Sequence, residues 1–151
     1  MKKFFWIVTF SILSQLTLLA SNDTEILHAS NIKACFKTNH CFNLEHANSN
    51  QKRKKGLMFR KTLPLNEGML FSFKEKNYIS MWMKNTYISL DIIWLNSNFQ
   101  IICTKENTIP FDLTPLSCSK QAKYVIELNA GSIKNASLKK KDNVILSIIS
   151  E

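Results

Sequence analysis

Apolar and polar positions alternate in short runs along this chain, and the runs predict extended segments rather than long helices. A strand is predicted over residues 90–95, and residues 92–95 are apolar at four successive positions, which is typical of a central strand covered on both faces. Asn96-Ser97-Asn98 predicts a hairpin turn after that strand. Further strands are predicted over residues 34–36, 41–44, 69–73, 79–84, 99–104, 123–128 and 144–149.

Two short helices interrupt the predicted strands. Ser49 is a suitable N-cap for a Lys-rich helix that ends near Lys55, and a second helix is expected from Ser132 to about Leu138. Residues 105–121, which contain two prolines, form the longest irregular segment. We therefore expect one mainly β domain, a compact β-sandwich or partly open barrel with one or two short helices.

The N-terminal twenty residues follow the order of a secretory signal peptide. Lys2 and Lys3 precede a mostly apolar stretch of about 16 residues, shorter than the ~20 of a membrane span, and Ala20 is a small residue at the expected cut. The expected division is a signal peptide at 1–20, a flexible leader at 21–31 and a single domain at 32–151. The alternative is an uncleaved N-terminal anchor. Cleavage predicts an exported bacterial protein, periplasmic or secreted, with no membrane span left.

The chain is basic, with a formal net charge of +9. Its densest basic run is Lys52-Arg53-Lys54-Lys55. Such a run can mark a nucleic-acid patch, but an exported protein does not meet nucleic acid, so we expect a solvated helix face. Weak attraction to anionic lipid or cell-wall polymer through the same charge stays open.

Four cysteines follow the predicted signal peptide, and an even count in a small exported chain favours disulfides. Local pairing of Cys35 with Cys41 and of Cys103 with Cys118 is the favoured arrangement among three. A zinc site is the rival interpretation, but the sequence holds no Cys-x-x-Cys pair. We predict no metal and no cofactor.

Several dense motifs stand at fixed spacing between residues 56 and 131 of the predicted domain. They are Gly56-Leu57-Met58-Phe59-Arg60, Leu63-Pro64, Gly68-Met69-Leu70-Phe71, Trp82-Met83-Lys84-Asn85-Thr86, Leu90-Asp91-Ile92-Ile93 and Tyr124-Val125-Ile126-Glu127-Leu128-Asn129-Ala130-Gly131. This set resembles the domain-of-unknown-function 192 family, also called uncharacterised protein family 0127. The resemblance implies a compact, jelly-roll-like β domain, often exported in bacteria, with no established activity. Met81 and Ser89 depart from the family pattern, which usually has Phe and Pro there.

Isolated polar residues among large apolar ones are the candidate site, because a charge in a core must be paired or functional. The candidates are Arg60, Trp82, Lys84, Asn85, Asp91 and Glu106. They predict a pocket for a small anionic or sugar-like ligand, with the guanidinium to clamp an anion and the indole to stack a ring. The alternative is that Arg60, Asp91 and Glu106 form a buried network that fixes the packing of the sheet.

Catalysis has weaker support in the sequence. There is no Gly-x-Ser-x-Gly nucleophile motif, and bridged cysteines would leave no thiol nucleophile. Asp91 and Glu106 are the residues that an enzyme acting on a small carbohydrate-like or anionic substrate would use as paired carboxylates. We interpret the chain as a non-catalytic, monomeric ligand-binding or envelope-associated accessory protein, with the enzyme as the alternative.

A third interpretation comes from methionine. Met81 and Met83 flank Trp82, and soft thioethers suit Cu(I). Methionine also fills irregular core space, and Met83 belongs to the apolar motif, which favours packing.

Overall fold

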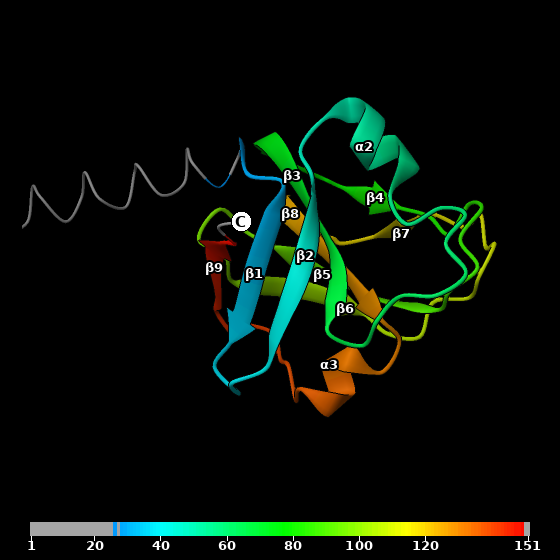
Figure 1. Cartoon of the computed structure of the whole chain (residues 1–151). Helices are drawn as coiled ribbons and strands as arrows, with labels where there is room; N and C mark the ends of the chain where they lie inside the picture. The colour runs from blue at the N-terminus through cyan, green and yellow to red at the C-terminus, as the bar shows by residue number, and fades with distance from the viewer. Residues whose placement is uncertain (1–25, 27, 150–151) are drawn as a thin grey trace, which may run out of the picture.

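The computed structural model describes residue 26 and residues 28–149, so the predicted signal peptide lies outside the described residues. In chain order the elements are β1 (Asn31–Phe36), β2 (Cys41–Ala47), α2 (Asn50–Lys55), β3 (Glu67–Asn77), β4 (Ser80–Met81), β5 (Leu90–Leu95), β6 (Ile101–Lys105), β7 (Leu116–Ser117), β8 (Ala122–Asn129), α3 (Ser132–Asn135) and β9 (Val144–Ile148). Figure 1 shows them wrapped around one another in a single body. Among the described residues there is no helix of the length and apolar character needed to cross a membrane.

Seven strands form one sheet in the order β6-β5-β8-β3-β2-β1-β9, and β4 pairs with β7 in a small second sheet. Only β2 and β3 run parallel; the other neighbours in the large sheet are antiparallel. Its two edges approach each other, because Ile101 N donates to Asp142 O and Val144 N donates to Phe99 O, both at 2.9 Å. The sheet is thus curled into a half-barrel, which confirms the predicted fold class.

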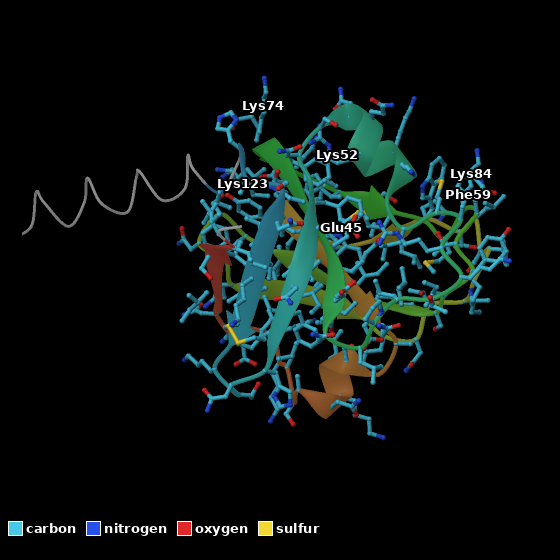
Figure 2. The ribbon with its side chains drawn as sticks, viewed as in Figure 1. Glu45, Lys52, Phe59, Lys74, Lys84 and Lys123 are labelled. Atoms are coloured by element: carbon cyan, nitrogen blue, oxygen red, sulfur yellow. A yellow bond between two sulfur atoms is a disulfide. The ribbon has the colours of Figure 1, made fainter. Side chains whose placement is uncertain are left out.

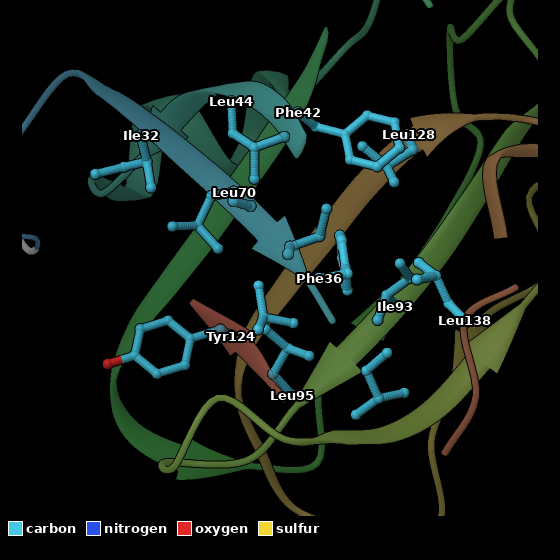
Figure 3. Packing of buried hydrophobic residues seen from close by; sticks show 14 of the residues in the cluster. Ile32, Phe36, Phe42, Leu44, Leu70, Ile93, Leu95, Tyr124, Leu128 and Leu138 are labelled. Atoms are coloured by element: carbon cyan, nitrogen blue, oxygen red, sulfur yellow. The ribbon is translucent and has the colours of Figure 1, made fainter. Parts of the chain in front are cut away.

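Strand β5 divides the core into two clusters. Ile93 and Leu95 point to the inside of the curl, where they pack in one cluster with Tyr124 and other apolar side chains (Figure 3). Ile92 and Trp94 alternate with them and pack on the outer face. All six residues of β5 are buried, as expected for a strand covered on both faces.

The outer face is covered by irregular segments rather than by a second large sheet. Leu57 and Leu63, from the chain that follows α2, pack there against Phe71 of β3. Trp94 Nε1 donates to Ile79 O at 3.1 Å, which fixes the segment before β4 on this face. These contacts leave room for a pocket between α2 and β4.

Two predicted elements are shorter than expected. The strand expected over residues 79–84 is only β4, because beyond Met81 the chain bonds to the long loop, with Met83 N donating to Asp112 O at 3.0 Å. The second helix ends at Asn135 rather than near Leu138, since Ser137 adopts a left-handed φ of 52°. The long loop also contains a short strand, β7.

Both disulfides have the favoured local pairing. Cys35 and Cys41 lie opposite each other on β1 and β2 with an S–S distance of 2.10 Å. Cys103 on β6 is bonded to Cys118 directly after β7 with an S–S distance of 1.98 Å. The second bridge fastens the long loop to the edge of the half-barrel.

Candidate functional site

A pocket of about 760 Å³ lies on the outer face of the sheet. Its walls come from α2 and the residues directly after it, from β3, and from the segment that contains β4. One side is rich in Lys, Arg, Asn and Gln, and the other is rich in aromatic and Met side chains. A cavity of this size, with apolar and polar walls facing each other, is large enough to hold a small ligand.

Glu127 of β8 forms part of the pocket floor. It pairs with Ile92 of β5 on one side and Met69 of β3 on the other, so it occupies the middle of the sheet. The residue is 4% exposed, and its carboxyl group makes no hydrogen bond or ion pair with any of the described residues. Every side-chain nitrogen or oxygen that is completely inaccessible has a hydrogen-bond partner among those residues. The Glu127 oxygens have no such partner, so they must remain accessible from the cavity.

Burial raises the pKa of Glu127 from its ordinary value of 4.5 to about 8. The group is therefore mostly a neutral carboxylic acid at pH 7. In that form it offers one O–H donor and a carbonyl acceptor at the base of the pocket. A ligand that places a hydroxyl group there would supply the partner that the protein does not.

Helix α2 forms the basic rim above this acid. Ser49 Oγ accepts from Lys52 N at 3.2 Å to begin the helix, and Arg53 Nη1 donates to Ser72 O at 2.8 Å to fasten it to β3. The Arg53 guanidinium also lies 5.1 Å from the centre of the Phe73 ring. With Arg53 held in this way, the exposed Lys54 and Lys55 stand at the pocket edge.

Gly56 ends α2 at a point where the backbone passes close to the floor. It has a φ of +49°, and a Cβ built on it would lie 3.3 Å from Phe71 Cζ and 3.9 Å from Glu127 Oε2. A left-handed conformation in so little space favours glycine. The pocket can therefore extend down to the Glu127 carboxyl group.

Trp82 and Tyr78 give the opposite wall its aromatic character, and both are exposed. Lys84 Nζ lies 5.3 Å from the centre of the Trp82 ring, a cation–π contact at the rim. Of the six predicted site residues, only Trp82 lines the pocket.

Arg60 binds Glu45 of β2 instead. Its two terminal nitrogens donate to the two carboxylate oxygens at 2.5 and 2.6 Å. The hydrogen bond from Arg60 lowers the pKa of Glu45, and the same bond raises the pKa of Arg60. Both side chains are partly exposed, so this pair is a surface brace outside the pocket.

Asp91 is fully buried, and backbone groups occupy both of its carboxylate oxygens. Oδ1 accepts from Asn107 N and Oδ2 accepts from Ile133 N, each at 2.9 Å. Glu106 is exposed next to Asn107. Arg60, Asp91 and Glu106 therefore do not share one set of contacts.

The remaining candidates, Asn85 and Lys84, lie on the loop after β4 and outside the pocket. Asn85 has a left-handed φ of 53°, and its carbonyl accepts from Phe59 N at 2.8 Å, while Lys84 is exposed. Met83 is fully buried, whereas Met81 is half-buried at the pocket wall. No cluster of three or more His, Cys, Asp or Glu residues suited to a metal occurs within the described part of the chain.

Sequence reasoning missed Glu127 as a site residue. The signal was present, because Glu127 is a single acid between Ile126 and Leu128 in a predicted strand. The argument that selected Asp91, a charge among apolar residues, applies equally to Glu127.

The fold and the site together define a half-barrel β domain with an acid-floored pocket. The chain belongs to the domain-of-unknown-function 192 family (DUF192, described as an uncharacterized ACR), whose model matches residues 32–146. It is similar to the crystal structure of a putative transcription regulator from Sinorhizobium meliloti 1021, with 32% identity, a TM-score of 0.72, and coverage of 76% of this chain and 91% of that chain.

A protein of unknown function from Novosphingobium aromaticivorans DSM 12444 is similar to the same degree, with 32% identity and a TM-score of 0.72 over 76% of this chain and 83% of that chain. No match was found among curated proteins. The relatives thus establish the family and the fold.

Proposed function

We propose that this protein is an exported, non-catalytic binding domain that holds a small sugar-like or anionic ligand in the pocket above Glu127. The observation that carries the proposal is the Glu127 carboxyl group, which is buried, without a protein partner among the described residues, and in contact with a cavity. An unpartnered buried polar group costs stability, and a bound hydroxyl group would offset that cost.

The walls of the pocket favour the same ligand class. Trp82 supplies an exposed ring face against which a sugar ring can stack, and Lys54 and Lys55 attract an anionic substituent. A small organic cation fits less well because it would pass this basic rim. Two disulfides support export, since such bonds persist in oxidising compartments.

An enzyme that uses Asp91 and Glu106 has no comparable support. Both oxygens of Asp91 accept backbone hydrogen bonds in the interior, and neither residue lines the pocket. A Cu(I) site that uses both Met81 and Met83 is likewise weakly supported, because Met83 is fully buried in the outer core cluster.

A titration with sodium glucuronate, followed by amide NMR shifts, tests the proposal. We expect shifts at Gly56, Trp82 and Glu127, and weaker shifts with uncharged glucose. Glu127→Leu should weaken binding by about tenfold or more, the equivalent of about 1.4 kcal/mol. Glu127→Gln should retain binding, because an amide still donates and accepts, but should lose the decline of affinity expected above pH 8 when the acid ionises.

The matched control is Glu106→Leu, which removes an exposed acid outside the pocket. Its affinity for glucuronate should equal that of the wild type. Shifts that survive in Glu127→Leu, or no shifts with either sugar, would contradict the proposed ligand class at this site.

A further inference from the structure

Six large apolar side chains are exposed on three loops at one end of the molecule. They are Phe59, Trp82, Tyr87, Ile109, Phe111 and Leu113, and their exposed fractions run from 48% to 69%. We call these residues the aromatic loop surface. Figure 2 places Phe59 and Lys84 at this end, and Figure 1 places β9 at the opposite end of the molecule.

Backbone hydrogen bonds join the three loops into one structure. Phe59 N donates to Asn85 O at 2.8 Å, and Phe111 N donates to Thr86 O at 3.2 Å. The rings of Tyr87 and Phe111 are in edge contact, with centroids 4.9 Å apart. The exposed side chains therefore stand on loops that are joined to one another, and those of Tyr87 and Phe111 are in direct contact.

Two of these aromatic residues have an unfavourable backbone conformation. Phe59 has a φ of 66° and Phe111 a φ of 62°, in the left-handed region that bulky residues rarely adopt. Strain of this kind persists where the surroundings enforce it and is frequent at binding surfaces. At Phe59 and Phe111 the backbone strain occurs together with exposure of the aromatic rings to water. That exposure is itself unfavourable.

Basic residues border the aromatic loop surface. Lys54 and Lys55 precede it at the end of α2, Lys61 is two residues after Phe59, and Lys84 lies over Trp82; all four are exposed. The acids on the same loops are Glu106 and Asp112, and Asp112 Oδ1 accepts from Thr114 N. Positive charge thus predominates around the apolar side chains.

We propose that the aromatic loop surface docks this domain onto a lipid bilayer that contains anionic phospholipid. Trp, Tyr and Phe partition to the level of the headgroups, and flanking lysines bind negatively charged lipid. A second protein with an apolar face would satisfy the rings but would not require the border of lysines. The proposal goes beyond ligand binding above Glu127. Trp82, Lys54 and Lys55 belong both to the pocket and to the aromatic loop surface or its border, and all three are left unchanged in the test.

Sedimentation with large vesicles tests the docking. One set consists of phosphatidylcholine alone and the other of an equal mixture of phosphatidylcholine and phosphatidylglycerol. The wild type and every variant are purified after export from the same cells, so that all of them have the same N-terminus. We expect the wild type to sediment with the mixed vesicles, less so at high salt, and not with phosphatidylcholine alone.

The test variant is Phe59→Asn combined with Phe111→Asn, because Asn tolerates the left-handed conformation and the fold should persist. Its vesicle affinity should fall by about tenfold or more, as expected for two rings withdrawn from the interface. The matched control is Ile145→Asn combined with Ile148→Asn, two exposed apolar residues of β9 at the opposite end. Its affinity should equal that of the wild type.

Lys61→Gln combined with Lys84→Gln should also weaken binding and reduce its dependence on salt. Undiminished sedimentation of the Phe59/Phe111 variant, or none of the wild type with mixed vesicles, would overturn the proposal. A third outcome would also overturn the proposal: the wild type does not bind vesicles but self-associates, and the Phe59/Phe111 variant does not self-associate. That result would indicate contact between two copies of the protein. The amide NMR shifts that glucuronate causes in the pocket should persist in the Phe59/Phe111 variant. A failure of the membrane-docking proposal can therefore be distinguished from a failure of the proposed ligand-binding function.

Discussion

The carboxylate of Asp91 on β5 accepts a hydrogen bond from Ile133 N in the first turn of α3, at 2.9 Å and across 42 positions in the sequence. Its second oxygen accepts from Asn107 N in the long loop, also at 2.9 Å. One buried acid thus joins a central strand, a helix terminus and a loop. Two backbone N–H groups that would otherwise lack an acceptor in the interior are satisfied by this one side chain.

Asp91→Asn should therefore destabilise the fold. The amide keeps one acceptor but directs an NH₂ group at one of the two backbone donors, which leaves that donor unsatisfied in the interior. We expect a loss of about 2 kcal/mol in the free energy of unfolding, measured by urea titration at pH 7. Lys84→Ala, at an exposed position of the same motif, should change it by less than about 0.5 kcal/mol. Equal stability of the two variants would refute the bracing role of Asp91.

Glu127 should make stability decline as the pH rises. Its pKa is about 8 in the folded protein and 4.5 as the ordinary value, so between these values the folded state binds a proton that the unfolded state has released. The contribution is fully present below pH 4.5 and is lost progressively up to about pH 8. We expect a loss on the order of a few kcal/mol across this window, with Glu127→Gln removing that part of the pH dependence.

Glu45 provides a control of opposite sign. Arg60 lowers the pKa of Glu45, so the contribution of Glu45 is present above pH 4.5 and disappears as the pH falls through the lowered value. Because the pair is partly exposed, Glu45→Gln should cost only about 1 kcal/mol or less near neutral pH. Urea titrations at intervals from pH 9 down to below the lowered pKa of Glu45 measure both effects. An unchanged decline towards high pH in Glu127→Gln would show that another group causes it.

The two disulfides should differ in their contribution to stability. Cys103 and Cys118 are 15 positions apart, and Cys35 and Cys41 are 6 apart. Loop-closure entropy predicts about 3 kcal/mol for the longer loop and about 2 kcal/mol for the shorter one. Replacing each pair by serine should therefore lower the melting temperature more for the 103–118 pair.

The longer loop also connects to the site, because β7 pairs with β4 and Met81 of β4 lines the pocket. Loss of the 103–118 bridge should accordingly broaden the amide signals of Met81 and Trp82, whereas loss of the 35–41 bridge should not. A larger fall in melting temperature for the 35–41 pair would contradict the entropy argument.

The sequence predicted the strands better than it predicted the partners of the charged residues, for a physical reason. Strand β5 was recognisable because its apolar run reports burial on both faces, which is a local property. The partners of Arg60 and Asp91 are non-local: Glu45 is 15 residues away on β2, and Ile133 is 42 residues from Asp91. The periodicity of a sequence does not predict such non-local pairings. An isolated charged residue among apolar ones therefore indicates that it has a partner or a function, but does not identify either one.

Gly68 should be the glycine least tolerant of substitution. A Cβ at this position would lie 2.3 Å from the backbone oxygen of Glu127 and 2.7 Å from Leu128 Cδ2, because β3 and β8 approach closely there. The backbone cannot move aside without a large cost, so Gly68→Ala should cost about 3 kcal/mol or more in the free energy of unfolding and should displace Glu127 in the pocket floor.

Gly131→Ala is the matched control. A Cβ there has no atom within 4 Å, so the only cost is that of an alanine at a left-handed φ of 87°. That cost is about 1 kcal/mol. Urea titration measures both variants, and a Gly68→Ala protein as stable as Gly131→Ala would show that the two strands can separate without penalty.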